Sequence, residues 1–361
     1  MSIFNTPEWD RKFEFLLDDI QSGRCVVLIG PEIVKIGDRT LRDVMRDHLQ
    51  KELPNAIAYY YERDGFFLFS NKTEYTKNDV QRQVALFYKN LEIGRDVPED
   101  LLLQLIRLPA QVFLSINPDA FLSEVANKYS IKHHFAFFKH GGAGVEEVEA
   151  PTSSKPLIYN LCGSLKDFKS LVLDYDDLFS LLKSLLGSPG IPPNLALPIR
   201  NAEHFLFIGF DFDKWYSQLL LRILNAEKGA RKIAFDTSEI SENTSTFLVQ
   251  QFGIEFIQDE HRFFQELIQR ADSAGLLRET SKALQGQEAL QILQLVQNGD
   301  LLAALNRLKN NPKSADDASG LLSQYHILEK GNAEKTIRSE DYLIGTNRII
   351  QTIQDRLKTD F

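Results

Sequence analysis

The chain has 361 residues, 43% of them hydrophobic and 25% charged, as in an ordinary globular protein with room for two domains. Its two cysteines exclude a disulfide framework and a four-thiolate zinc site, and they favour a reducing compartment. The net charge is −9 and no basic cluster with interleaved aromatic residues is visible, so nucleic acid is not an expected ligand.

Neither a membrane nor a metal is indicated. No apolar run approaches the roughly 20 residues that span a bilayer, and the start, MSIFNTPEWD, lacks the basic residues and apolar core of a signal peptide. His133, His134 and His140 lack metal-ligand spacing. We therefore expect a cytoplasmic protein with no bound metal.

Short apolar runs alternate with amphipathic segments over the first 270 residues. A helix is predicted between the capping segment Thr6-Pro7-Glu8 and Gly23, and Thr40 begins another. Apolar side chains at helical spacing predict further helices at 80–91, 178–185 and 215–224. Runs typical of buried strands lie at 25–30, 111–117, 156–161, 204–209, 232–236 and 254–257, and loops are expected at 141–154 and 188–198. This order predicts an α/β, Rossmann-like parallel sheet of about six strands with helices on both faces.

Strand signals end after Gly275. Helical patterns follow at 287–310, 315–330 and 339–358, and this segment carries equal numbers of acidic and basic side chains. We therefore predict a domain over residues 1–275 and a small C-terminal all-α domain over 276–361.

Four predicted strands end in glycine or polar residues. The segments are Gly30-Pro31-Glu32-Ile33, Asn117-Pro118-Asp119, Asn160 to Ser164, and Gly209-Phe210-Asp211. Open parallel sheets bind ligands beyond the carboxyl ends of their strands, so all four segments are expected to face one crevice. Each also has an ordinary structural interpretation, because glycine permits tight turns and Asn or Asp suits turns and helix caps.

The order and spacing of these segments resemble a divergent sirtuin-like domain, of the kind found in bacterial antiviral systems as an effector that consumes NAD. The resemblance covers roughly residues 10–270 and rests on VVLIGPEIV, FLSINPDAFL, PLIYNLCGSLKDFKSLVLDYDDLFSLL and FLFIGFDFDKWYSQLLLRIL. It implies NAD or a related nucleotide as the cofactor. Asn117 matches the asparagine that positions water against the nicotinamide riboside, and Asp119 is its structural neighbour. Gly30 matches the first glycine of the phosphate loop, and Gly209 the glycine beside the adenosine half.

Two departures from the family pattern concern catalysis and nucleotide binding. Cys162 stands where active members have histidine, and Gly163 and Ser164 match the residues that follow it. A thiol of ordinary pKa, about 8.5, acts as a base only beside a neighbour that lowers its pKa. Pro31 and Glu32 lie at positions of the family's phosphate loop. Pro31 lacks a backbone N–H and Glu32 adds a negative charge, and both changes disfavour the binding of pyrophosphate. Cys162 is therefore either a replacement base or a packed thiol on a scaffold that has lost catalysis.

The tail resembles a small helical effector-associated domain. The stretches are LVQNGDLLAALNRLK and LLSQYHILEKGNAEKTIRSEDYLIGTNRIIQTIQDRL, in which the fitting residues are Leu322, Tyr325, Leu328, Glu329, Ser339, Tyr342, Asn347, Arg348 and Ile349. Such domains resemble death-type adaptors and pair with like domains of bacterial conflict systems, so a protein partner carrying a matching domain is implied. A helical packing or homo-oligomerisation appendage is the alternative.

Together these resemblances imply a component of a bacterial antiviral defence system. Its sirtuin-like part is expected to bind NAD or a related nucleotide and its tail to dock a partner. The resemblance leaves two versions, in which NAD is either hydrolysed or only bound. The alternative is a catalytically inactive pseudoenzyme that acts as an assembly, sensor or adaptor module. If NAD is hydrolysed, Asn117 and Cys162 are the expected catalytic residues.

Overall fold

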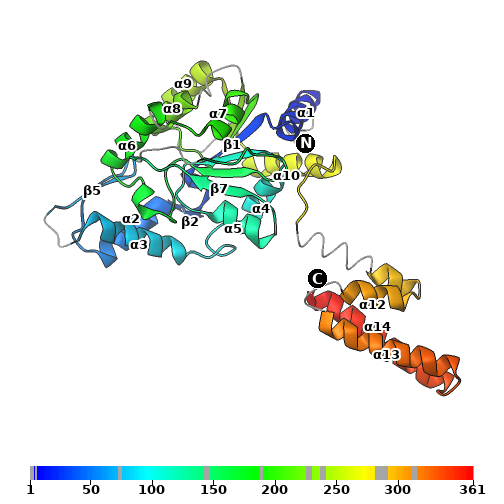
Figure 1. Ribbon diagram of the computed structural model, residues 1–361. Coiled ribbons are helices and arrows are strands. Elements are labelled where there is room, and N and C mark those ends of the chain that lie inside the picture. Colours follow the sequence, from blue (N-terminus) through cyan, green and yellow to red (C-terminus); the bar gives the residue numbers. More distant parts are fainter. Residues whose placement is uncertain are drawn as a thin grey trace. The chain divides into compact units, whose positions relative to one another are not determined.

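The computed structural model describes residues 4, 6–71, 75–141, 147–187, 190–224, 230–235, 241–280, 292–309 and 315–360. The chain divides into two compact units, Met1–Arg278 and Glu279–Phe361. Each unit is described by itself below, with the element labels of Figure 1.

A parallel sheet in the order β11-β10-β9-β1-β6-β8-β7 forms the middle of the first unit (Figure 1). Its strands are β1 (Cys25–Ile29), β6 (Val112–Ser115), β7 (His134–Phe137), β8 (Leu157–Asn160), β9 (His204–Ile208), β10 (Arg231–Phe235) and β11 (Ile254–Ile257). The prediction of a parallel α/β sheet is confirmed. The count of about six strands missed β7, a half-exposed edge strand without the continuous apolar run of a buried one.

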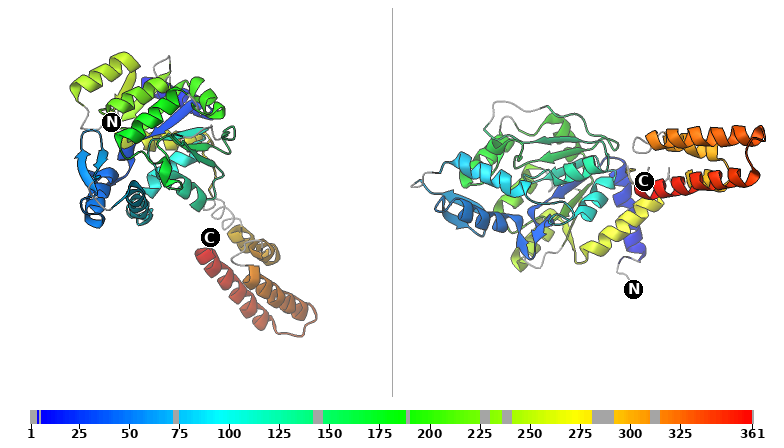
Figure 2. Two further views of the ribbon diagram at one scale, coloured as in Figure 1. Left: turned by 60° about the vertical axis from the view of Figure 1, so that its left-hand side comes forward. Right: turned by 90° about the horizontal axis from the view of Figure 1, so that it is seen from below.

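Helices cover both faces of the sheet (Figure 2). Alternate residues of β1 serve the two layers, since Val27 packs in one hydrophobic core and Val26 and Leu28 pack in the other. The first core is shared with α1 (Pro7–Gln21), α2 (Leu41–Glu52), α3 (Lys77–Lys89), α4 (Glu99–Arg107), α5 (Phe121–Lys128) and α10 (Glu260–Ser273). The second is shared with α6 (Tyr175–Leu186), α7 (Pro193–Arg200), α8 (Trp215–Ile223) and the π-helix η3 (Leu248–Phe252), which continues α9 (Glu242–Phe247).

The helix starts follow the capping signals in the sequence. The Thr6 side chain accepts a hydrogen bond from the Trp9 N–H at the start of α1, and Thr40 does the same for Asp43 in α2. The predicted loop at 188–198 is wrong in its second half, where α7 begins at Pro193. A proline in the first turn of a helix loses no hydrogen bond, which accounts for Pro193, whereas Pro198 lies in the interior of this short helix.

Two antiparallel hairpins lie between β1 and α3. The first pairs β2 (Lys35–Ile36) with β3 (Arg39–Thr40), and the second pairs β4 (Ile57–Tyr61) with β5 (Phe66–Phe69). Gly65 has a φ of +73°, a conformation that favours glycine, and it ends the turn between β4 and β5. Two short 3₁₀ helices complete the unit, η1 (Pro31–Ile33) and η2 (Phe168–Ser170).

The described part of the second unit consists of helices and turns. It contains a helical segment at 292–297, α12 (Leu301–Lys309), α13 (Ala315–Ala333) and α14 (Ser339–Asp360). The predicted single helix at 287–310 is wrong, because Gly299, with a φ of +79°, breaks it in a turn at 298–300; positions 287–291 and 310 lie outside the described residues. Over the residues of the tail that the structure describes, the all-helical prediction is confirmed. Within the described residues of both units, no helix combines the length and apolar character needed to cross a membrane.

Candidate functional site

The four polar strand ends lie along one edge of the sheet. Strands β9, β1, β6 and β8 are consecutive neighbours and run parallel, so their carboxyl ends are adjacent. The segments that begin at Gly30, Asn117, Asn160 and Gly209 therefore come together, although up to 179 positions separate them in the chain.

The loops after β1 and β9 are locked to each other. The Gly30 N–H donates to the Ile208 carbonyl at 2.8 Å, and the Glu32 N–H donates to the Gly209 carbonyl at 2.9 Å. A Cβ at Gly30 would lie 2.2 Å from the Gly209 oxygen, and one at Gly209 would lie 2.3 Å from the Ile33 nitrogen. Both glycines are thus needed for backbone-to-backbone contact. We call this contact the clasp.

The clasp does not fit the pyrophosphate of a dinucleotide. Phosphate loops bind through free backbone N–H groups, but the N–H groups of Gly30 and Glu32 already donate within the protein. Pro31 has no N–H, and the Glu32 carboxylate, only 7% exposed and 3.5 Å from the Lys35 ammonium, places a negative charge beside the loop.

Asn117 and Asp119 lie in a small, largely closed site just after the end of β6. The Asn117 Nδ2 group donates to the Gly30 carbonyl at 2.9 Å, so its side chain supports the clasp. Asn160 Nδ2 donates to the Asp119 carbonyl at 2.6 Å, and burial raises the pKa of the Asp119 carboxyl to about 6. These three side chains line a cavity of about 20 Å³, which is too small for a nucleotide.

Cys162 faces a different cavity. Its thiol lines a space of about 220 Å³ that shares no lining residue with the Asn117 cavity among the described residues. Burial raises the pKa of the Cys162 thiol to about 12, although the Arg42 guanidinium opposes this shift. The thiol is therefore protonated at neutral pH. The structure does not bring the two predicted catalytic side chains into one cavity.

Gly163 and Ser164 shape the turn after β8. Gly163 has a φ of +85°, and a Cβ there would lie 1.9 Å from the Ser170 carbonyl oxygen. Ser164 is fully buried, and its N–H donates to the Ser170 hydroxyl at 2.9 Å. Both residues hold η2 against the strand end.

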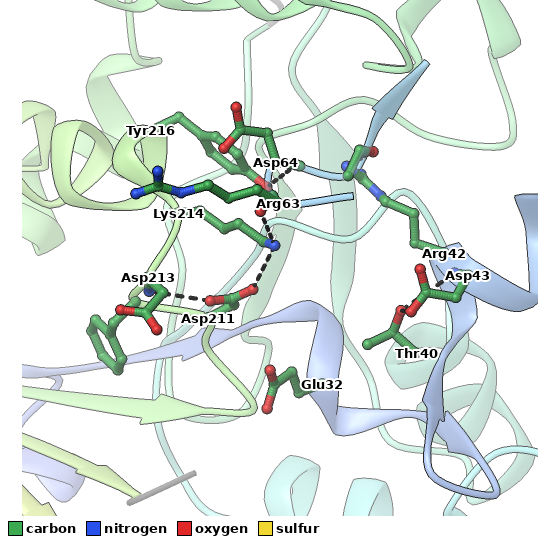
Figure 3. A network of polar contacts seen from close by, with 12 residues as sticks. Glu32, Thr40, Arg42, Asp43, Arg63, Asp64, Asp211, Asp213, Lys214 and Tyr216 are labelled. Carbon is green, nitrogen blue, oxygen red and sulfur yellow. Dashed lines mark hydrogen bonds and ion pairs between the residues drawn. The ribbon is translucent and has the colours of Figure 1, made fainter. Parts of the chain in front are cut away.

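The larger cavity is lined by carboxylates from separate elements (Figure 3). They are Glu32, Asp43, Glu62, Asp64 and Asp211, against two cationic groups, Arg42 and Lys214. Aromatic walls come from Tyr60, Phe66 and Tyr216. An excess of carboxylates in a partly desolvated space repels phosphate and attracts cations.

Most carboxylates of this cavity accept hydrogen bonds. Asp43 accepts from the Thr40 hydroxyl at 2.7 Å, and Asp64 accepts from the Tyr175 hydroxyl at 2.5 Å. Asp211 lies 3.3 Å from the Lys214 ammonium; it does not cap α8, whose N-cap is Lys214. The possibility that Asp211 is a helix cap is therefore wrong.

The sequence reasoning missed the walls contributed by α2 and the β4–β5 hairpin. Arg42, Asp43 and Phe66 lie outside the strand-end segments that suggested the crevice. One signal was available: the Asp64-Gly65 pair between two aromatic runs is typical of a hairpin. Among the residues that the structure describes, no group of three or more His, Cys, Asp and Glu side chains is arranged to hold a metal ion.

Comparison with known proteins confirms both resemblances. Residues 111–257 match the family model of the SIR2-like domain, and residues 287–359 match that of effector-associated domain 11. The chain therefore carries a SIR2-like domain and an effector-associated domain. No curated protein matches the chain. The SIR2-like match includes Asn117, Cys162 and Gly209 but begins after Gly30, so it omits half of the clasp. SIR2-like domains are NAD-related in general, and this pair of domains indicates a protein of the defence-system type.

Proposed function

We propose that this protein is a component of a bacterial defence system whose SIR2-like domain is a pseudoenzyme. In this proposal the domain assembles or senses, and the effector-associated domain docks a partner that carries a matching domain. The two domains comprise about residues 1–275 and 276–361, and the protein acts in the cytoplasm.

The observation that carries the proposal is the clasp. The N–H groups of Gly30 and Glu32 are engaged and Pro31 has none, so the first three residues of the loop offer no donor to a pyrophosphate. The raised pKa of the Cys162 thiol, about 12, points the same way, because a general base must be deprotonated near the working pH.

NAD hydrolysis is the second candidate function. The observation in its favour is the position of Asn117, just after β6, and of Asn160, at the end of the adjacent strand β8. Both lie at the carboxyl edge and within the range that matches the SIR2-like domain. In that version NAD or a related nucleotide binds at Gly30, Asn117, Asp119, Gly163, Ser164 and Gly209, with Asn117 and Cys162 catalytic.

Release of nicotinamide from NAD by the purified full chain separates the two candidates. The proposal predicts no release above that of the buffer, with or without a partner. Release that falls at least a hundredfold in Asn117→Ala and in Cys162→Ala would establish the hydrolase instead. Release that persists in Cys162→Ala but disappears in Asn117→Ala would also refute the pseudoenzyme, and it would assign the base to another residue.

The docking role is supported by apolar side chains exposed on the second unit. Ile327 on α13 is 71% exposed, and Leu343 and Ile344 on α14 are 59% and 53% exposed. Apolar surface of this kind favours protein contacts. Co-expression with candidate proteins that carry effector-associated domains should give a complex that Leu343→Asp with Ile344→Asp abolishes, while the helical circular dichroism is kept. A complex that survives the double substitution would exclude this surface.

A further inference from the structure

A row of aromatic rings lies beside the larger cavity. Tyr59, Tyr61, Tyr175, Phe179 and Trp215 make successive ring contacts, with centroid distances of 4.9, 5.0, 6.5 and 6.3 Å. We call these five residues the aromatic strip. They come from β4, α6 and α8, and the exposed fractions of Tyr59, Phe179 and Trp215 are 58%, 57% and 39%. Contiguous exposed aromatic surface is characteristic of interaction sites.

The aromatic strip is continuous with the cavity. Tyr175 contacts the Phe66 ring, which lines the cavity, at 5.2 Å, and its hydroxyl donates to Asp64 at 2.5 Å. At the other end, Trp215 contacts the cavity residue Tyr216 at 5.9 Å. A ligand that lies along the strip can therefore place a side chain in the cavity.

The chemistry of the cavity suits a cation. Its lining has five carboxylates against two cationic side chains, and Arg46 and Lys35 from outside the lining pair with Glu62 and Glu32. Figure 3 shows Glu32, Asp43 and Asp211 approaching the same opening from different elements. The aromatic wall already holds a guanidinium, since the Arg42 Cζ lies 5.4 Å from the centre of the Phe66 ring. Aromatic faces and carboxylates together are the surroundings that bind ammonium and guanidinium groups.

We propose that the aromatic strip and the cavity together bind an extended, basic segment of a partner protein, with one lysine or arginine side chain in the cavity. The rings, which meet in edge and tilted contacts, bind the aliphatic parts of the segment, and the carboxylates provide charge complementarity. At about 3.3 Å per residue, roughly six extended residues cover the strip. The inference rests on the proposed sensor or assembly role, to which it adds the chemistry of the partner.

The test measures peptide binding to the full chain by tryptophan fluorescence. The chain has two tryptophans, so Trp9→Phe leaves Trp215, on the strip, as the reporter. The probe is an acetylated and amidated six-residue peptide of alternating arginine and leucine. The matched probe replaces arginine with glutamate, and spermidine represents a free polyamine.

The arginine peptide should bind with saturation, more weakly as salt increases, and at least tenfold more tightly than the glutamate peptide. Phe179→Ala and Asp64→Asn should each weaken binding roughly fivefold. Phe15→Ala, at a ring 49% exposed on α1, and Asp18→Asn, on the same helix, are the matched controls and should leave binding unchanged.

Three results would overturn the inference: no saturable binding of the arginine peptide, equal loss in the α1 controls, or spermidine binding as tightly as the peptide. The last result would assign the cavity to a free polyamine. Nicotinamide release from NAD in the same preparation would refute the pseudoenzyme but not the peptide site, whereas loss of peptide binding alone would leave the pseudoenzyme intact.

Discussion

Gly30→Ala is the substitution that most directly probes the clasp. The Gly30 backbone, with φ −102° and ψ 177°, is one that alanine adopts without strain. The new Cβ would however lie 2.2 Å from the Gly209 oxygen and 2.4 Å from the Phe210 Cα, both backbone atoms that cannot rotate away. Overpacking of this kind costs about 1–3 kcal/mol. Loss of the hydrogen bond between the Glu32 N–H and the Gly209 carbonyl adds about 1 kcal/mol.

The expected destabilisation of roughly 2–4 kcal/mol should lower the Tm of the first unit by about 5–10 °C. Thermal unfolding followed by circular dichroism measures it. Gly37→Ala is the control, because no atom lies within 4 Å of its Cβ and only left-handed strain, about 1 kcal/mol, is added at a φ of +61°. A Tm for Gly30→Ala equal to that of wild type would refute the clasp, since a loop that stands free to bind phosphate would accept the methyl group.

Three further predictions concern partly buried groups of the first unit. Burial raises the pKa of Asp119 from 3.8 to about 6, so the folded state binds more protons than the unfolded state, and the stability of the fold should decrease as pH rises through that range. Asp119→Asn should remove this decrease, measured as urea midpoints at pH 4.5 and 7, and an unchanged pH dependence would contradict the assignment. Burial raises the pKa of Cys162 to about 12 and also raises that of Cys25. Iodoacetamide at pH 8, followed by mass spectrometry, should therefore label neither thiol before the protein unfolds, and rapid labelling of Cys162 alone would show that this thiol is activated. The Arg278 guanidinium donates hydrogen bonds to four main-chain carbonyls. Arg278→Met should therefore lower the free energy of unfolding, measured in urea, by roughly 2–4 kcal/mol, and a decrease of less than about 1 kcal/mol would mean that water replaces those bonds.

The parallel sheet was predictable because its central strands are buried on both faces. The run CVVLIG is continuously apolar, and all five residues of β1 are buried. Elements at the edge gave weaker signals: β7 pairs with one strand only, and it is preceded by His133. The π-helix η3 has no sequence signature, since its hydrogen-bonding pattern depends on local packing.

The site was predictable in part. The carboxyl ends of parallel strands share an edge, so the prediction of parallel strands alone placed Asn117 and Gly30 at the same edge of the sheet. That their strands are direct neighbours comes from the structure. Whether the Gly30 N–H faces a ligand or the Ile208 carbonyl is a matter of tertiary contact, and a glycine satisfies either requirement. The separation of Asn117 and Cys162 into two cavities likewise depends on side-chain packing that no local pattern encodes.

Direct titration of NAD into the full chain by isothermal calorimetry tests the central claim, that the clasp leaves no place for a pyrophosphate. The account predicts no saturable heat, with any affinity weaker than about 1 mM. ADP-ribose, which carries the same pyrophosphate without nicotinamide, should behave identically. A Kd for NAD below about 100 μM that Gly30→Ala or Asn117→Ala weakens at least tenfold would contradict the account and identify the crevice as a dinucleotide site.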